Sequence, residues 1–238
     1  MEITEQRSAR PIRWRTRSMY WWIGLSSAAI AVFAPLPYLT SSLETLTSSE
    51  SLLAANYVDR PAGIRLALYL HICFAGLALL LSPAQFSTRL RARVPRLHRI
   101  CGRIAFVSIG VGGCAGLVIS TVNVAGPIGT AGFGLLAVLW VGFAWTAFRA
   151  VQRHDFVRHR EWAIRTFALT YAGVTLRLWL GVLIPLQSGF ADVDSDLAFT
   201  RAYYIVTFLA WVPNLLVAER FLRTTGPRDD LRAARLVR

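Results

Sequence analysis

The sequence has 238 residues, of which 55% are hydrophobic and only 16% charged. A soluble domain of this length would carry more charge and fewer apolar residues, so the composition favours an integral membrane protein. The formal net charge of +13 comes from 26 arginines with no lysine, and they cluster between long apolar runs instead of forming one basic surface, which argues against nucleic-acid binding.

Six apolar runs are long enough to cross a bilayer, which takes about 20 helical residues. They cover residues 19–39, 66–86, 102–122, 129–150, 163–186 and 201–222. The first run is too long for the core of a signal peptide and no small-residue cleavage site follows it, so we interpret it as a retained span. We therefore predict an all-α membrane protein with six transmembrane helices, whose spans two to five form the core of the bundle. A basic tail (1–18) precedes the transmembrane domain (19–222), and a second basic tail (223–238) follows it.

The arginines indicate the orientation of these spans. Twenty-two of the 26 lie in the two tails, in the loops that follow spans two and four, or in the span ends that adjoin them, which an even number of spans places on one side. Only Arg60, Arg65 and Arg201 fall on the other side, and Arg177 lies within a span. By the positive-inside rule, both termini are predicted to be cytoplasmic.

Three of the predicted helices carry stripes of small and polar residues, which in lipid face other helices. Each stripe begins or ends at a histidine. On span two it comprises His71, Ala75, Ala78, Ser82 and Gln85; on span three, His98, Gly102, Ala105, Ser108, Gly112, Gly116 and Ser120; on span five, His159, Trp162, Thr166, Thr170, Gly173 and Arg177. Ordinary packing of small residues also explains these stripes. On span five, His159 and Arg177 are 18 residues apart, which is five whole helical turns, so both are predicted to face the interior of the bundle.

His98 and His159 fall at the same depth, at the cytoplasmic ends of spans three and five. Two imidazoles on opposite helices are what a haem b needs as axial ligands, and cationic groups such as Arg99, Arg103 and Arg160 would neutralise its propionates. The sequence thus gives a candidate haem site, with His98 and His159 as iron ligands. The alternative is that both histidines are interfacial or packing residues, and that the arginines only reflect topology.

Arg177 is the residue that is most costly to place in a membrane, at about 2.5 kcal/mol or more on insertion scales. It should therefore face the bundle interior, where His71 and Asn123 fall in the same outer half of the membrane. Asn214 and Tyr204 on span six are further candidates for this wall. We predict a polar pocket for an anionic or quinone-like ligand; the alternatives are snorkelling of Arg177 or hydrogen bonds to helix carbonyls.

Two segments carry a family resemblance, "RLHRICGR" (96–103) and "RHREWAIRTFALTYAGVTLRLWL" (158–180). They resemble the paired signatures of an uncharacterised bacterial integral-membrane family, domain of unknown function 2306, and the resemblance covers roughly residues 65–185. It implies a multi-pass protein of the bacterial inner membrane and no particular activity.

A looser resemblance is to transmembrane b-type cytochromes of the b561 kind, in which six helices hold two haems. It implies that His98 and His159 hold one haem and that His71 supplies half of the second site. Span four has no histidine to complete that second site.

Two functions are therefore expected from the sequence. The first is a haem b redox protein that exchanges electrons with a quinone-like partner. The alternative is a transporter or binding protein for a lipophilic or anionic small molecule, or a structural membrane subunit without a cofactor.

Overall fold

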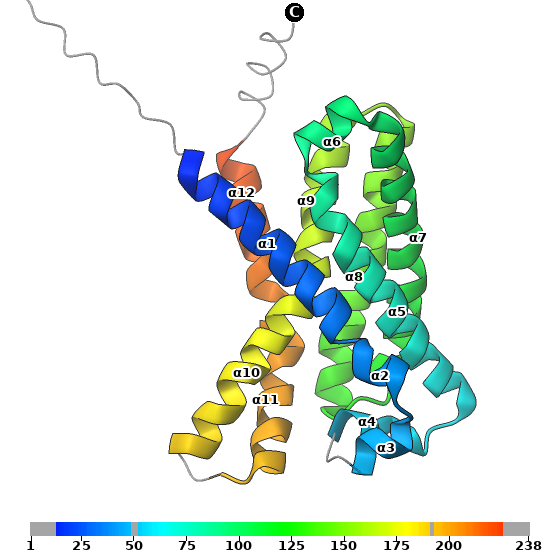
Figure 1. Cartoon of the computed structure of the whole chain (residues 1–238), viewed down its shortest axis with the longest axis vertical. Helices are drawn as coiled ribbons and strands as arrows, with labels where there is room; N and C mark the ends of the chain where they lie inside the picture. The colour runs from blue at the N-terminus through cyan, green and yellow to red at the C-terminus, as the bar shows by residue number, and fades with distance from the viewer. Residues whose placement is uncertain (1–12, 49–51, 191–192, 226–238) are drawn as a thin grey trace, which may run out of the picture.

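The computed structural model describes residues 13–48, 52–190 and 193–225, and all the regular structure of these residues is helical (Figure 1). The helices are α1 (Arg13–Phe33), α2 (Leu36–Thr40), α3 (Leu43–Ser48), α4 (Leu52–Val58), α5 (Ala62–Gln85), α6 (Thr88–Arg93), α7 (Pro95–Ser120), α8 (Gly126–Gln152), α9 (Phe156–Thr170), α10 (Ala172–Phe190), α11 (Ser195–Leu209) and α12 (Val212–Thr224). Residues 1–12 and 226–238 of the two predicted tails lie outside the described residues.

Six helical segments of the described chain are long and apolar enough to cross a membrane, which confirms the predicted number of spans. They are Ser18–Thr40, Ala62–Gln85, Pro95–Ser120, Gly126–Gln152, Phe156–Gly189 and Ser195–Thr224. Several begin earlier than the apolar runs do, because a helix continues through its charged end turn once it is capped. Pro95 occupies the first turn of α7, and the Asp155 carboxylate accepts a hydrogen bond from the Arg158 amide (3.0 Å) at the start of α9.

The centre of the molecule is a bundle of α5, α7, α8 and α9, in which each helix packs against the next and α9 packs back against α5. A buried cluster fills it, made of Ala78, Ile109, Trp140, Ala144, Leu169, Ala172 and Trp211. This confirms that spans two to five form the core. Because α7 and α9 are diagonal in this bundle, His98 and His159 come from opposite corners.

The first described helix, α1, lies across the outside of the bundle, and large apolar residues such as Trp21, Trp22 and Phe33 are exposed along it. An exposed apolar face of this kind suits contact with lipid. A hydrogen bond between the hydroxyls of Ser26 and Tyr171 (2.8 Å) ties α1 to the junction of α9 and α10.

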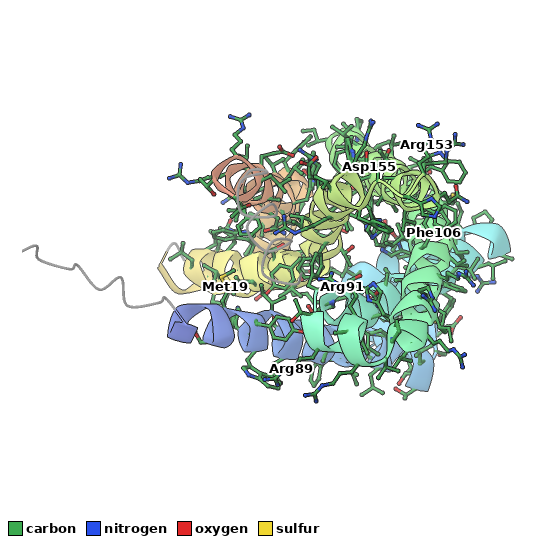
Figure 2. All side chains as sticks on the ribbon, turned by 90° about the horizontal axis from the view of Figure 1, so that it is seen from above. Met19, Arg89, Arg91, Phe106, Arg153 and Asp155 are labelled. Atoms are coloured by element: carbon green, nitrogen blue, oxygen red, sulfur yellow. The ribbon has the colours of Figure 1, made fainter. Side chains whose placement is uncertain are left out.

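The start of α1 and the end of α12 lie at the same end of the molecule, together with α6 (Figure 1). We call this the arginine-rich end. Seen from there, Figure 2 shows Arg89 and Arg153 on different sides of the bundle. The grouping of arginines at one end agrees with the predicted topology, and the assignment of this end to the cytoplasm stays a prediction.

The opposite end carries three short helices: α2 at the end of the first span, and α3 and α4 between spans one and two. Leu43, Ala54 and Tyr57 of these helices are buried against Leu68, near the start of α5. Their burial fixes this segment over one end of the bundle. The helical segment α2–α4 therefore forms part of a wall, which a solvated loop would not provide.

Spans five and six are each interrupted near their midpoints, which corrects the prediction of a continuous fifth helix. The first break is at Tyr171, between α9 and α10, and the second is at Ala210 and Trp211, between α11 and α12. Figure 1 shows α10 and α11 leaving the bundle at an angle as a hairpin. The phase of a 3.6-residue repeat does not carry across such a break, so the spacing of His159 and Arg177 is no evidence that they share a face.

Two side chains, Thr175 and Asn214, connect the two breaks by hydrogen bonds. We call this pair the clamp. The Thr175 hydroxyl donates to the Ala210 carbonyl. The Asn214 amide donates to the Ala168 carbonyl (3.2 Å), to the Thr175 hydroxyl (3.0 Å) and to the Ala210 carbonyl (3.1 Å). The clamp thus supplies donors to carbonyls that the interrupted helices leave without their usual partners.

Replacing Asn214 with Ala should lower the free energy of unfolding by about 1–2 kcal/mol, because hydrogen bonds between membrane helices are typically worth about 0.6 kcal/mol each. Thermal or SDS-induced unfolding of the purified protein measures this change. Thr146→Ala is the control, since that exposed hydroxyl bonds only the Gly142 carbonyl of its own helix. Wild-type stability in the Asn214→Ala protein would contradict a role for the clamp.

Candidate functional site

A cavity of about 250 Å³ lies between the hairpin α10–α11 and the bundle, on the side of α2 to α4. Small residues on the facing helices make room for it, among them Gly76, Gly113, Gly116, Ala137 and Gly173. Such a volume exceeds the roughly 150 Å³ that accommodates benzene in an apolar protein interior. Three of the predicted pocket residues, His71, Asn123 and Arg177, line this cavity.

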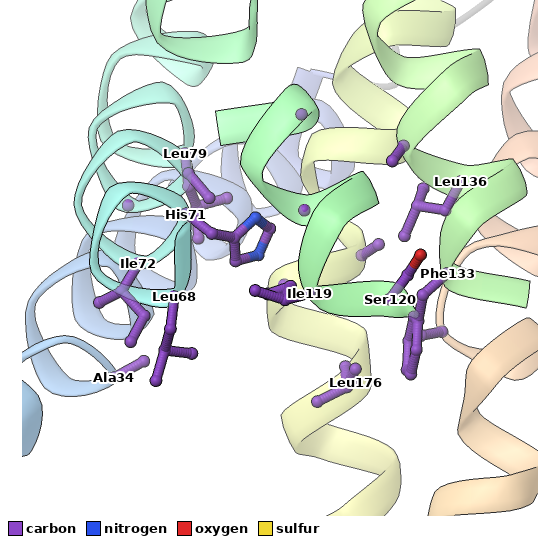
Figure 3. A pocket seen from close by; sticks show the side chains of 18 of the residues that line it. Ala34, Leu68, His71, Ile72, Leu79, Ile119, Ser120, Phe133, Leu136 and Leu176 are labelled. Atoms are coloured by element: carbon purple, nitrogen blue, oxygen red, sulfur yellow. The ribbon is translucent and has the colours of Figure 1, made fainter. Parts of the chain in front are cut away.

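His71 projects from α5 toward α7 (Figure 3). Its Nδ1 lies 2.8 Å from the Gly112 carbonyl oxygen. Because a carbonyl only accepts, Nδ1 carries the proton of the neutral ring, and Nε2 keeps its lone pair. The ring packs directly on Gly116, where an added Cβ would lie 2.8 Å from Nδ1. Glycine at 116 is thus required for this position of the imidazole.

Arg177 lines the cavity from α10 and is exposed, so it lies where the cavity opens. Its Nη1 donates to the Gly173 carbonyl (2.8 Å), one turn earlier, as the alternative of a hydrogen bond to a helix carbonyl predicts. A guanidinium has five N–H donors. The described residues accept from one of them and offer Arg177 no carboxylate within ion-pair distance.

Three tyrosines line the cavity together with this arginine, and none of them was predicted from the sequence. Tyr38 on α2, Tyr57 on α4 and Tyr203 on α11 all line the cavity. Tyr38 and Tyr203 lie close enough to Arg177 to interact with it electrostatically, as does His71. Burial raises the pKa of Tyr57 to about 12, so this phenol stays protonated at neutral pH. The cavity therefore combines one fixed positive charge with phenolic hydroxyl groups.

Asn123 lines the cavity but uses its polar atoms in the turn between α7 and α8. Its amide donates to the carbonyls of Ser120 and Gly126, and its oxygen accepts from the Ala125 amide (2.8 Å). Gly129 leaves room for it, because a Cβ there would overlap the Asn123 oxygen. Asn123 thus shapes the wall of the cavity.

Two other predicted positions lie elsewhere. Asn214 belongs to the clamp and does not line the cavity. Tyr204 points away, with 42% of its surface exposed, and its neighbour Tyr203, 8% exposed, takes the place that was predicted for it. Successive side chains on a helix point about 100° apart. Because the rotation of this helix about its axis is not known from the sequence, the prediction named the wrong one of two adjacent tyrosines.

The second candidate site is at the arginine-rich end, where His98 and His159 each lie in the first turn of their helices. Both are half-buried, and they are close enough to interact electrostatically. The Nδ1 of His159 lies 2.9 Å from the Ala147 carbonyl oxygen, which leaves Nε2 with its lone pair. The Nδ1 of His98 is buried without a hydrogen-bond partner in the described chain. The structure thus places both histidines at the same end of the bundle, and their pairing as iron ligands stays a prediction.

The three arginines predicted to accompany these histidines differ in burial. Arg99 and Arg103 are exposed at this end of α7, and Arg160 is half-buried on α9. The side chain of Gln85 lies over Gly102, where a Cβ would be 3.1 Å from Oε1, and Gln85 Nε2 is also buried without a partner in the described residues. In the described residues, no group of three or more His, Cys, Asp or Glu side chains is placed to hold a metal ion.

A hydrophobic layer separates the two candidate sites. Trp140 of α8 donates from Nε1 to the Thr170 hydroxyl (2.8 Å), which itself donates to the Thr166 carbonyl (2.9 Å). Trp140 and Leu169 belong to the buried core cluster and also form the inner end of the cavity. The polar stripe predicted along span five is thus divided by packed apolar side chains.

The fold and the cavity define a multi-pass α-helical membrane protein with a largely apolar cavity between its spans, which one arginine and several polar side chains also line. Residues 68–222 match a family described as predicted membrane protein (DUF2306), and the chain belongs to this family. This confirms the resemblance drawn from the arginine- and histidine-rich segments. Comparison with curated proteins gives no match, and comparison with solved structures gives none either.

Replacing Gly116 with Ala should destabilise the protein by about 1–3 kcal/mol, because the added methyl displaces the His71 ring and breaks its bond to Gly112. Gly142→Ala is the matched control, since an added Cβ at 142 meets nothing within 4 Å. Unfolding of both variants in detergent measures the difference. If the two variants have equal stability, His71 is not held as described.

Proposed function

We propose that this protein binds a small organic anion in the cavity beside Arg177. The observation that supports this is the state of the guanidinium: it carries a fixed positive charge, it lines the cavity, and four of its five N–H donors find no acceptor in the described chain. A membrane protein that places an arginine in a span normally pairs it or uses it. An anionic ligand would supply both the missing charge and the missing acceptors.

The rest of the lining supports an anion over a cation. Arg177 is the only charged residue among the described residues that line the cavity, and no Asp or Glu contributes to it. The phenols of Tyr38, Tyr57 and Tyr203 are hydrogen-bond donors when protonated, and His71 lies within electrostatic range of Arg177. A carboxylate accepts from donors of this kind, and charge-assisted hydrogen bonds are the stronger ones.

A quinone-like ligand would also accept hydrogen bonds here, but it carries no charge to balance Arg177. The two classes therefore differ in how strongly binding depends on the charge of the arginine. Whether the bound anion is also moved across the membrane is a further step, which uptake into vesicles would measure.

The protein in lipid nanodiscs should bind hexanoate, and Arg177→Gln should weaken this binding about tenfold to a hundredfold, because a hydrogen bond to a charged group is worth about 1.5–3 kcal/mol. Equilibrium dialysis against labelled hexanoate measures both affinities, with empty nanodiscs as the blank for partition into lipid. Arg177→Lys keeps the charge and should retain part of the affinity.

Hexanamide is the matched ligand control, since it has nearly the same shape without the charge. It should bind the wild-type protein weakly and should not respond to Arg177→Gln. If hexanamide binds as well as hexanoate, Arg177 does not act as a counter-charge. If menadione, a neutral quinone, binds instead and hexanoate does not, the ligand is of the quinone class and the proposal is wrong.

A second candidate function is supported by the histidine pair at the arginine-rich end: one b haem, with His98 and His159 as its axial ligands. His159 already has the arrangement that ligating histidines use, with Nδ1–H donated to a carbonyl and Nε2 available. The buried Nδ1 of His98 has no partner in the described chain, and the two residues come from diagonal helices. Bound there, a haem would supply one-electron redox chemistry, and Arg99, Arg103 and Arg160 would face its propionates.

The visible spectrum of protein expressed with haem supply tests this second function. We expect a Soret band that disappears in both His98→Ala and His159→Ala and persists in His71→Ala, which serves as the control. A wild-type protein without a Soret band would exclude the haem, while leaving the anion site at Arg177 unaffected.

A further inference from the structure

We infer that the ligand of the cavity is an amphiphile, with its anionic head beside Arg177 and its apolar tail directed toward the centre of the bundle. This inference rests on the proposed anion site and adds the chemical class and the orientation of the ligand. It follows from the way in which polar and apolar residues are distributed along the length of the cavity.

The polar groups gather at the end covered by α2 and α4, which we call the head end. Tyr38 and Tyr57 come from these two short helices, and Tyr203 comes from the middle of α11. Arg177 stands within electrostatic range of Tyr38 and Tyr203, and Tyr203 within range of Tyr57. The charged group of a ligand would therefore be held at this end.

The other end of the cavity is apolar, and we call it the floor. Leu79, Gly113, Ala137, Trp140, Leu169 and Ala172 form it, and three of them belong to the buried core cluster. Leu79 lies eight residues beyond His71 on α5, or about 12 Å at 1.5 Å per residue. In Figure 3, Leu68 and Leu79 mark the two ends of this wall, with His71 and Ile72 between them.

The floor has no hydrogen-bonding groups left for a polar ligand. Trp140 is its polar side chain, and its Nε1 donates to the hydroxyl of Thr170, which lines the cavity beside the floor and itself donates to the Thr166 carbonyl. A polar group pushed into the floor would lose its own hydration without finding a partner, whereas an alkyl tail loses nothing of this kind. The distribution of partners therefore favours a ligand with one polar end.

A position near the middle of the cavity allows its length to be altered. Gly173 lies one turn from Arg177, and a Cβ added there would meet only the Leu79 side chain, at 3.7 Å, which is an ordinary contact. The Gly173→Ala protein should therefore fold normally, and its added methyl should narrow the part of the cavity that leads to the floor. Leu79→Ala does the reverse, because it removes side-chain volume from the floor itself.

The test is the affinity of nanodisc-embedded protein for straight-chain carboxylates from butanoate to dodecanoate, measured by equilibrium dialysis against the free aqueous concentration and corrected with empty nanodiscs. Each added methylene should tighten binding about fourfold, from the transfer free energy of one CH₂ group, until the tail reaches the floor. Beyond that length the affinity should stop rising.

The two variants should shift this optimum in opposite directions. Gly173→Ala should move it to shorter acids and Leu79→Ala to longer ones, while Arg177→Gln should weaken binding of every acid by a similar factor. Gly181→Ala is the matched control on the same helix, since a Cβ there meets nothing within 4 Å, and it should leave the optimum unchanged.

The outcomes separate the two proposals. If no acid binds in an Arg177-dependent way, the anion site itself is wrong. If the acids bind with an Arg177-dependent affinity that does not change with chain length, or if the optimum stays fixed in both Gly173→Ala and Leu79→Ala, the anion site stands and the amphiphile is excluded.

Discussion

The broken helices of spans five and six are the constraint on which the rest of this structure depends. In a bilayer, backbone groups that lose their helical partners must find others within the protein. Here Thr175 and Asn214 supply donors to carbonyls at both breaks. Because the two breaks lie side by side, α10 and α11 leave the bundle together as one hairpin. The space between this hairpin and α5, α7 and α8 contains the cavity, so its shape follows from the clamp.

The chemistry of the cavity follows from a charge that packing does not neutralise. An arginine within a span costs at least about 2.5 kcal/mol, and a single hydrogen bond to Gly173 recovers only part of that cost. Tyr38 and Tyr203 lie within electrostatic range of Arg177 without providing a counter-charge. A protein that used this arginine only for packing would gain more from a nearby carboxylate. Such a carboxylate exists on α12 for another arginine: Arg165 forms two hydrogen bonds to Glu219.

The histidines and the cavity occupy different ends of the same bundle, with the layer of Trp140 and Leu169 between them. A ligand at one end therefore has no direct polar contact with a group at the other. This separation makes the two candidate functions independent of each other. It also explains why the polar stripe of span five, read as one continuous surface, suggested a closer relation between His159 and Arg177 than the structure has.

The sequence by itself determined the class of the protein, the number of its spans, the helices that form its core and the family to which it belongs. These properties depend on the length of apolar runs, on the positions of arginines and on local motifs, all of which are local along the chain. The sequence also placed His71 and Arg177 near each other. An arginine inside a span is costly and should face the bundle interior, and His71 lies at a similar depth on another span. Reasoning from depth in the same way placed His98 and His159 at one end of the bundle.

Only the tertiary structure decided which groups line the cavity. Tyr38 and Tyr57 reach it because α2 to α4 fold back over α5, and nothing local in a polar segment indicates such a return. Tyr203 and not Tyr204 faces inward because the break at Ala210 sets the rotation of α11. Asn214 belongs to the clamp because its hydrogen-bond partners lie where the two helix breaks meet. Neither break is visible in the apolar pattern of the sequence. Contacts between residues far apart in the chain depend on helix rotation and crossing, which hydrophobic length and charge do not specify.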